Sequence, residues 1–173
     1  MSLTVGFKSE LTLPPGVFDF VGTSMVGNLN ELPGAPLTPG NNAVGSRLVQ
    51  TDQPVQFSFR WNVKGIMTHA FNPAFLWQVE ILFERYGPGE FNIGPVGSIV
   101  LPFGSGTLSG TTTTFPGILA PGSTTINIPP STVPAGVYDI VAVIRLVHPG
   151  TLLPCFLAAF AEFGKIQFYR EHV

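Results

Sequence analysis

The stretch Pro54–Lys64 has the sequence Pro-Val-Gln-Phe-Ser-Phe-Arg-Trp-Asn-Val-Lys, in which apolar and polar residues alternate. Side chains two residues apart lie on the same face of a strand, so this pattern predicts a strand with one buried face. Gly65 is expected to end the strand. The face expected in the core carries Val55, Phe57, Phe59, Trp61 and Val63.

Two longer stretches on the C-terminal side extend this pattern. In Ala74–Tyr86, aromatic and β-branched residues recur at alternate positions, which favours a strand over a helix. Gly136–Val147 is apolar on both faces, which is typical of a central strand. One face carries Phe75, Trp77, Val79, Ile81 and Phe83 in the first stretch, and Tyr138, Ile140, Ala142, Ile144 and Leu146 in the second.

Shorter segments bounded by glycine or proline predict further strands. In chain order these are Thr4–Leu13, Phe91–Phe103, Thr111–Phe115, Ser123–Ile128, Leu153–Phe163 and Lys165–Arg170. The last two are expected to form a hairpin or one strand bent at Gly164, while Phe18–Val26 is ambiguous. In the Phe91–Phe103 strand, Val96, Ile99 and Leu101 are expected in the core.

The 20 glycines and 17 prolines divide the chain into short segments, which argues against long helices. Seven to nine short strands predict an all-β chain of one domain, residues 1–173. We expect a single antiparallel β-sandwich of the immunoglobulin-like or jelly-roll-like kind, with a closed barrel as the alternative. Residues 51–173 would form the core, and residues 1–50 a strand plus a loop or arm that includes the Pro/Gly-rich segment Leu32–Ser46.

The sequence Val133-Pro-Ala-Gly-Val-Tyr138 leads directly into the apolar strand. It resembles the Pro-x-Gly-x-Tyr corner of immunoglobulin-like and fibronectin type III-like sandwiches. The resemblance implies that the Tyr138 hydroxyl bonds back to the preceding corner, and Trp61 is placed as a core tryptophan would be. The chain has one cysteine, so it lacks the paired cysteines of antibody domains. Trp61, Trp77, Gly136 and Tyr138 are therefore expected to have structural roles.

Charged residues make up 10% of the 173 residues, against about 25% in a typical soluble domain. The net charge is -2 and no basic run occurs, which argues against nucleic acid as a partner and against binding to anionic membranes. No apolar run reaches the about 20 residues that a membrane helix needs. With 45% hydrophobic residues, low charge favours association with a protein partner or with copies of the chain. No signal peptide is visible, so we expect a cytoplasmic protein, with export by another route left open.

No pattern of catalytic or metal-binding residues is present in the sequence. His69, His148 and His172 are widely separated, and Cys155 lies in an apolar run as a core thiol would. We therefore predict no catalytic residue, no metal and no cofactor. Glu80 and Glu84 are expected to lie opposite Arg60 and Lys64 of the preceding strand, while Asp139 and Arg145 are expected to pair with neighbours.

These observations predict a non-enzymatic structural or protein-interaction module that self-associates or joins a larger assembly. The alternative is a ligand-binding sandwich, lectin-like or similar to a small β-toxin, that uses loop aromatics and the Thr/Ser-rich loop Thr107–Thr114. A glycan is possible as a ligand but has no sequence support. The residues predicted for an interaction surface are Leu37, Phe71, Phe75, Tyr86 and Phe91.

Overall fold

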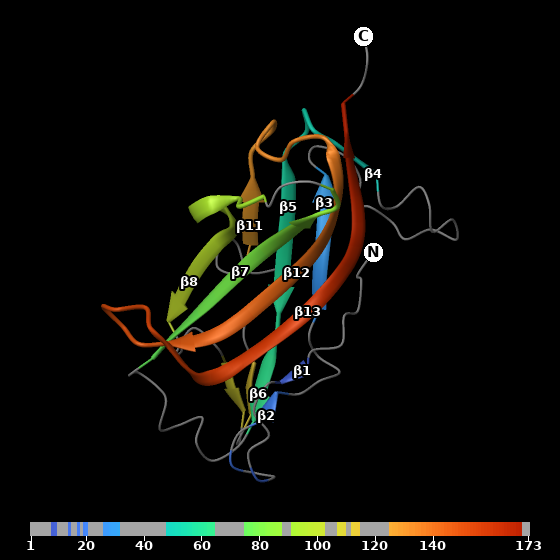
Figure 1. The fold of residues 1–173 in the computed structure, drawn as a ribbon. Helices are drawn as coiled ribbons and strands as arrows, with labels where there is room; N and C mark the ends of the chain where they lie inside the picture. Colours follow the sequence, from blue (N-terminus) through green and yellow to red (C-terminus); the bar gives the residue numbers. More distant parts are fainter. Residues whose placement is uncertain are drawn as a thin grey trace.

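The computed structural model describes residues 8–9, 14, 17, 19–20, 26–31, 48–64, 75–87, 91–102, 107–109, 112–114 and 125–170. Within these residues the chain is all β, with one short 3-10 turn and no α-helix, so the predicted class is confirmed. Figure 1 shows the arrangement. The strands are β1 (Lys8–Ser9), β2 (Asp19–Phe20), β3 (Val26–Glu31), β4 (Leu48–Gln50), β5 (Val55–Arg60), β6 (Asn62–Lys64), β7 (Leu76–Arg85), β8 (Ser98–Pro102), β9 (Thr107–Ser109), β10 (Thr112–Thr114), β11 (Thr125–Ile128), β12 (Gly136–Val147) and β13 (Pro154–Tyr169).

The largest sheet has six strands, in the order β1-β13-β12-β7-β8 with β4 also paired to β13 (Figure 1). The pairs along this order are antiparallel, whereas β4 runs parallel to β13. The expectation of a wholly antiparallel sheet is thus wrong at this one pair. A parallel neighbour is possible there because about 100 residues of chain separate β4 from β13, far more than a parallel connection requires.

The predicted strand Pro54–Lys64 is divided at Trp61 and contributes to two smaller sheets. Its first part, β5, lies between β11 and β3, and its second part, β6, belongs to the sheet β2-β6-β10-β9. The Thr/Ser-rich segment Thr107–Thr114 contains β9 and β10, which pair with one another. Strand β10 lies within the predicted strand Thr111–Phe115, whereas β9 lies in the part that was predicted as a loop. Besides β6 and β9, the strands β2, β3 and β4 of the first fifty residues raise the number above the seven to nine expected.

Aromatic side chains from β5 meet those of the six-stranded sheet in a common core. The ring of Phe57 lies 6.2 Å from that of Phe83 on β7 and 5.6 Å from that of Phe163 on β13, both edge to face. Trp61 and Trp77 also meet edge to face, 5.9 Å apart. The β11-β5-β3 sheet accordingly lies behind the six-stranded sheet in Figure 1.

The predicted alternation of β7 and β12 is confirmed. Strand β12 has the expected bounds, Gly136–Val147. The alternate positions of β12 from Tyr138 to Leu146 are buried, as are Trp77, Val79, Ile81 and Phe83 of β7, while Phe75 is half-buried against them. Hydrophobic burial of these two faces is the main force that fixes the register of the sheet.

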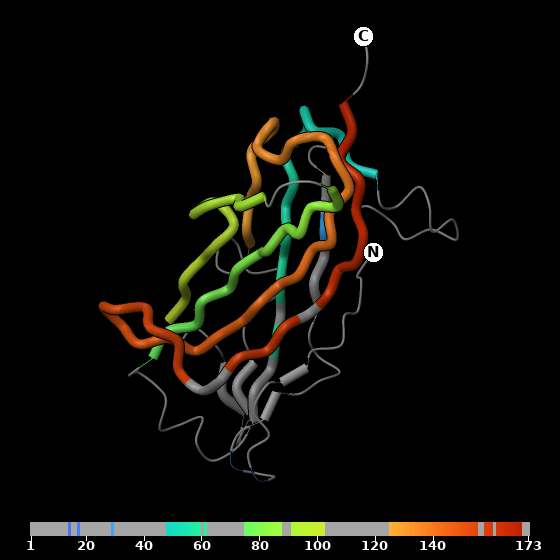
Figure 2. Tube along the Cα trace, viewed as in Figure 1, coloured from blue at the N-terminus to red at the C-terminus, as the bar shows by residue number. Residues whose placement is uncertain are grey.

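Strand β13 is one continuous strand with a bulge, so the bent-strand prediction is confirmed over the hairpin. Ile140 pairs with Gly164 but the next residue, Val141, pairs with Glu162, which leaves Phe163 as the extra residue. Gly164 has a φ of 75°, in the left-handed region that side chains disfavour. Figure 2 shows β13 following β12 along its whole length.

Replacing Gly164 by alanine is expected to lower the free energy of unfolding by about 1–2 kcal/mol, because alanine pays the steric cost of the left-handed conformation. Gly164→Asn is the matched control, since asparagine tolerates this conformation better. Urea denaturation of both variants measures the difference. Equal stability of the alanine variant and the unaltered protein would contradict this account of the bulge.

The predicted strand Phe91–Phe103 is wrong in its first half. Residues Gly94–Gly97 form the 3-10 turn, and Val96 is 40% exposed instead of buried. The turn is tight at Gly97, where an added Cβ would lie 2.3 Å from Cγ2 of Ile93. Leu101 is buried and Ile99 packs against the core, as expected.

Several N-terminal predictions fall partly or wholly outside the described residues. Within Thr4–Leu13, the pair Lys8–Ser9 forms β1 at the edge of β13. The ambiguous segment Phe18–Val26 contains β2. The segment Leu32–Ser46 lies outside the described residues.

Candidate interaction surface

The outer face of the six-stranded sheet is the face of β7, β12 and β13 that points away from the core. Strand register assigns its members, because residues opposite one another in an antiparallel pair share a face. From β7 these are Gln78, Glu80, Leu82 and Glu84; from β12, Val137, Asp139, Val141, Val143 and Arg145; and from β13, Ala158, Phe160, Glu162, Lys165 and Gln167.

One polar cluster on the outer face is built around Arg145. Its guanidinium forms an ion pair with Glu80 and donates a hydrogen bond of 3.2 Å from Nε to Oε1 of Gln78. Gln78 in turn donates from Nε2 to Oγ of Ser98 at 3.3 Å. The expectation that Arg145 pairs with a neighbour is therefore confirmed.

The expectation that Glu80 and Glu84 face Arg60 and Lys64 is wrong. Strand β7 pairs with β12 and β8, and the strand that carries Arg60 and Lys64 belongs to the other sheets. The alternation of β7 was correct, whereas Ser58 on the predicted polar face of β5 is buried. Alternation also does not reveal which strands are neighbours.

A second polar group lies nearer the C-terminal end of β7. Glu84 lies opposite Asp139, which lies opposite Lys165 on β13. The Tyr86 hydroxyl donates to Oδ2 of Asp139 at 3.4 Å, and Nζ of Lys165 lies 4.6 Å from the centre of the Tyr86 ring. Tyr86, predicted as a surface residue, is half exposed and packs against this ammonium group.

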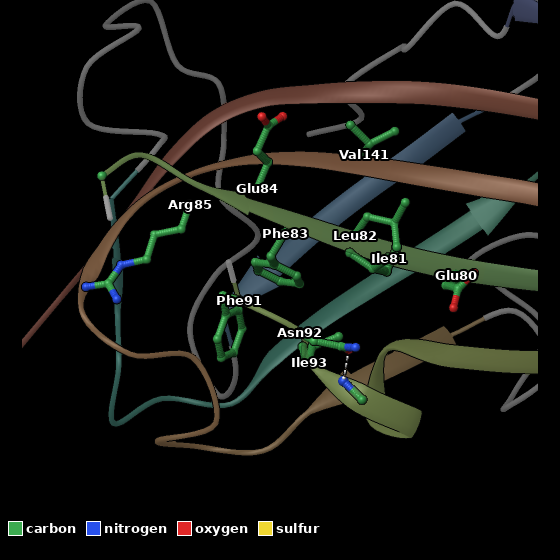
Figure 3. A pocket seen from close by; sticks show the side chains of 12 residues that line it. Glu80, Ile81, Leu82, Phe83, Glu84, Arg85, Phe91, Asn92, Ile93 and Val141 are labelled. Atoms are coloured by element: carbon green, nitrogen blue, oxygen red, sulfur yellow. Dashed lines mark hydrogen bonds between the residues drawn. The ribbon is translucent and has the colours of Figure 1, made fainter. Parts of the chain in front are cut away.

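A hollow of about 760 Å³ lies beside this group, between β7 and the segment that follows it (Figure 3). Phe91 forms a bridge with Phe83, and Ser98 pairs with Glu80. The hollow forms because the chain leaves the edge of β7 between these two points. Oδ1 of Asn92 accepts a hydrogen bond of 2.8 Å from the N–H of Gly94 and so fixes this turn. The apolar lining comes from Leu82, Phe91, Ile93 and Val141, and the polar lining includes Glu80, Glu84 and Asn92.

The other predicted surface aromatics are more buried than Tyr86. Phe91 is half-buried, with ring centres 5.9 Å from Phe83 and 5.6 Å from Tyr138. Phe75 is half-buried and lies 5.0 Å from the ring of His148. Phe91 lines the hollow beside the C-terminal end of β7. Phe75 lies at the opposite end, immediately before the first residue of that strand. Phe71 and Leu37 lie outside the described residues.

The sequence did not indicate the exposed leucines of the described surface. Leu82 occupies a polar position in the alternation of β7 and is 47% exposed. Leu152 and Leu153 lie in the turn between β12 and β13, where they are 43% and 61% exposed. Leu152 has a φ of 53°, which is unusual for a leucine and signals a constrained turn. The feature of the sequence that could have revealed this exposed turn is the pair of adjacent leucines between two strands.

The residues predicted to be structural lie in the core or at its edge. Trp61, Trp77 and Tyr138 are fully buried. The Tyr138 hydroxyl donates to the carbonyl oxygen of Pro134 at 2.9 Å, so the predicted bond to the preceding corner is confirmed. Burial raises the pKa of Tyr138, and nearby Arg85 partly offsets this. At Gly136 an added Cβ would lie only 3.3 Å from the Tyr138 ring.

Cys155 is a free cysteine that lies partly buried on β13. Burial raises the pKa of the Cys155 thiol, which disfavours the reactive thiolate. Among the described residues, no group of three or more His, Cys, Asp or Glu side chains could hold a metal ion. No described helix is long and apolar enough to cross a membrane.

Comparison with known proteins gives no further assignment: no family model matches the chain, and no curated protein matches it.

Proposed function

We propose that the chain is an immunoglobulin-like β-sandwich that acts as a non-enzymatic interaction module and associates with copies of itself. Strand order supports the fold. Strands β8, β7, β12 and β13 follow the order C′-C-F-G of a variable-type domain, and β3, β5 and β11 follow the order A-B-E of its second sheet. Trp77 then occupies the strand that carries the core tryptophan in that family.

Tyr138 supports the same assignment. In immunoglobulin-like domains the corner tyrosine lies at the start of strand F, two residues before the second cysteine. Tyr138 lies near the start of β12 and bonds to the corner that precedes it. Ile140 replaces the cysteine, and its complete burial in an apolar cluster supplies packing where antibody domains have a disulfide.

The exposed leucines between β12 and β13 carry the proposal of self-association. Residues 146–161 contain no Asp, Glu, Lys or Arg, and their turn presents Leu152 and Leu153 to solvent. Leu152 and the exposed Val100 both line a shallower hollow of about 480 Å³, whose lining also includes the polar side chains of Gln78 and Glu80. Exposed leucines in a turn whose neighbouring residues carry no charge favour burial against another protein surface.

Size-exclusion chromatography with light scattering tests this proposal. The protein is expected to form oligomers whose share rises with concentration, and Leu153→Asp is expected to leave it monomeric because the aspartate would have to be desolvated in the contact. Leu48→Asp is the matched control, since Leu48 is an exposed leucine on β4. A clean monomer at high concentration, or equal loss of oligomers in both variants, would refute self-association through this turn.

The described residues give less support to the ligand-binding alternative. Phe75 and Phe91 pack partly into the core, and residues of the Thr/Ser-rich segment form β9 and β10. A glycan screen without binding would remove this alternative, whereas binding that depends on Tyr86 would restore it.

A further inference from the structure

The hollow between β7 and the turn at Gly94–Gly97 has the size and lining of a binding site. Its volume of about 760 Å³ lies within the range of roughly 300–1,000 Å³ that such sites occupy. Leu82 and Val141 lie next to each other across β7 and β12, and Phe91 and Ile93 line it from the neighbouring turn (Figure 3). Leu82 is nearly half exposed, so its apolar surface is open to a partner.

Glu80 and Glu84 of β7 line the hollow, and two further carboxylates lie on the neighbouring strands outside its lining. Glu84 lies opposite Asp139, so two like charges meet on adjacent strands, and Glu162 lies opposite Val141 on the next strand. Opposed like charges repel, and a cation placed between them would relieve that repulsion.

The cations of the outer face are already engaged. Over β7, β12 and β13 this face carries two cations, Arg145 and Lys165, against the four carboxylates Glu80, Glu84, Asp139 and Glu162. Arg145 is paired with Glu80, and Lys165 lies over the ring of Tyr86. Arg85 also lines the hollow, but its guanidinium points away from Leu82 in Figure 3 and lies beside Gly136.

From this charge pattern we propose that the hollow docks an extended polypeptide segment in which an apolar side chain is flanked by lysine or arginine. A second copy of the same face would oppose carboxylate to carboxylate, which disfavours it as the occupant. The proposal does not rest on self-association, because it uses a different set of residues from Leu152 and Leu153.

Strand spacing defines the pattern that the segment should carry. Leu82 and Glu84 are two residues apart on one face, about 7 Å at roughly 3.3 Å per residue. An extended peptide has the same repeat, so a basic residue two positions from its apolar residue would reach Glu84 and Asp139. The pattern is Lys-x-Leu-x-Lys, with the leucine over Leu82 and Val141.

Fluorescence anisotropy with three labelled peptides tests the proposal at low salt. The probe is Lys-Ser-Leu-Ser-Lys, with Glu-Ser-Leu-Ser-Glu and Lys-Ser-Ser-Ser-Lys as the matched controls for charge and for the apolar residue. The probe is expected to bind at least about tenfold more tightly than either control, and to weaken as salt is added. Saturable binding by the probe alone supports the proposal.

Protein variants show whether binding occurs at this hollow. The double variant Glu84→Gln, Asp139→Asn is expected to weaken binding of the probe by about tenfold, as should Leu82→Thr. Asp52→Asn removes one exposed carboxylate from the turn before β5 and should leave affinity unchanged. Far-UV circular dichroism establishes that each variant is folded.

Three outcomes would overturn the proposal: no binding by the probe, equal binding by the glutamate peptide, or equal weakening by Asp52→Asn and by the double variant. Light scattering on the double variant separates this site from self-association. Oligomers that persist while the probe no longer binds show that the two surfaces act independently, whereas monomeric wild-type protein that binds the probe would refute only self-association.

Discussion

Replacing Trp77 by alanine is expected to lower the free energy of unfolding by about 3–5 kcal/mol, enough to unfold much of the population if the protein is marginally stable. Trp77 is fully buried, and its ring meets that of Trp61 edge to face at 5.9 Å. It also lies between Leu146 on β12 and Leu101 on β8 in the strand register. Alanine would leave a cavity where parts of the chain distant in sequence meet.

Urea denaturation followed by far-UV circular dichroism measures this loss. Leu82→Ala is the matched control, because Leu82 lies on the same strand but faces solvent, and its effect should stay within about 0.5 kcal/mol. Similar losses in the two variants would contradict the assignment of inner and outer faces to β7.

Replacing Tyr138 by alanine is expected to cost a similar 3–5 kcal/mol, roughly the range for large buried aromatics. Its ring contacts Phe83, Phe91 and Phe168 at 5.6–5.8 Å, and its hydroxyl donates to Pro134. Tyr138→Phe keeps the ring and removes only the hydrogen bond, so this variant should lose about 1 kcal/mol of the free energy of unfolding. Chemical denaturation of both variants separates packing from the hydrogen bond, and a phenylalanine variant as unstable as the alanine variant would refute this division.

The same tyrosine should make stability fall at alkaline pH. Burial raises the pKa of Tyr138 above its ordinary value of 10.0, so the unfolded chain loses this proton first as the pH rises. The neutral phenol therefore stabilises the fold fully below pH 10, and this contribution declines as the pH rises through the higher folded pKa. Denaturation midpoints between pH 9 and pH 11 should show a smaller decline in Tyr138→Phe, and equal declines would refute the role of Tyr138.

The period of two in the sequence was sufficient to find the main strands. The bounds of β12 and the buried faces of β5, β7 and β12 follow from apolar residues at alternate positions. The corner before Tyr138 was also predictable, because the Pro-x-Gly-x-Tyr pattern is local. These features depend on residues close together in the chain, where propensity and periodicity carry most of the information.

Features that depend on strand neighbours were not predictable. Glu80 pairs with Arg145, 65 residues away, instead of with the preceding strand, because alternation assigns a face but no partner strand. Val96 was expected in the core, but it lies in the 3-10 turn Gly94–Gly97 outside the sheet and is exposed. The hollow beside Leu82 was not predictable for both of these reasons. It requires the strand order β13-β12-β7 and also the turn that leaves the sheet.

The position of β13 has a consequence for how the protein folds. Strand β13 is the last described strand, yet it pairs with β12, β1 and β4 and supplies Phe163, Ile166 and Phe168 to the core. A folding intermediate in which β13 has not yet docked would expose one edge of the apolar strand β12. An unpaired apolar strand edge is the kind of surface through which partly folded chains aggregate.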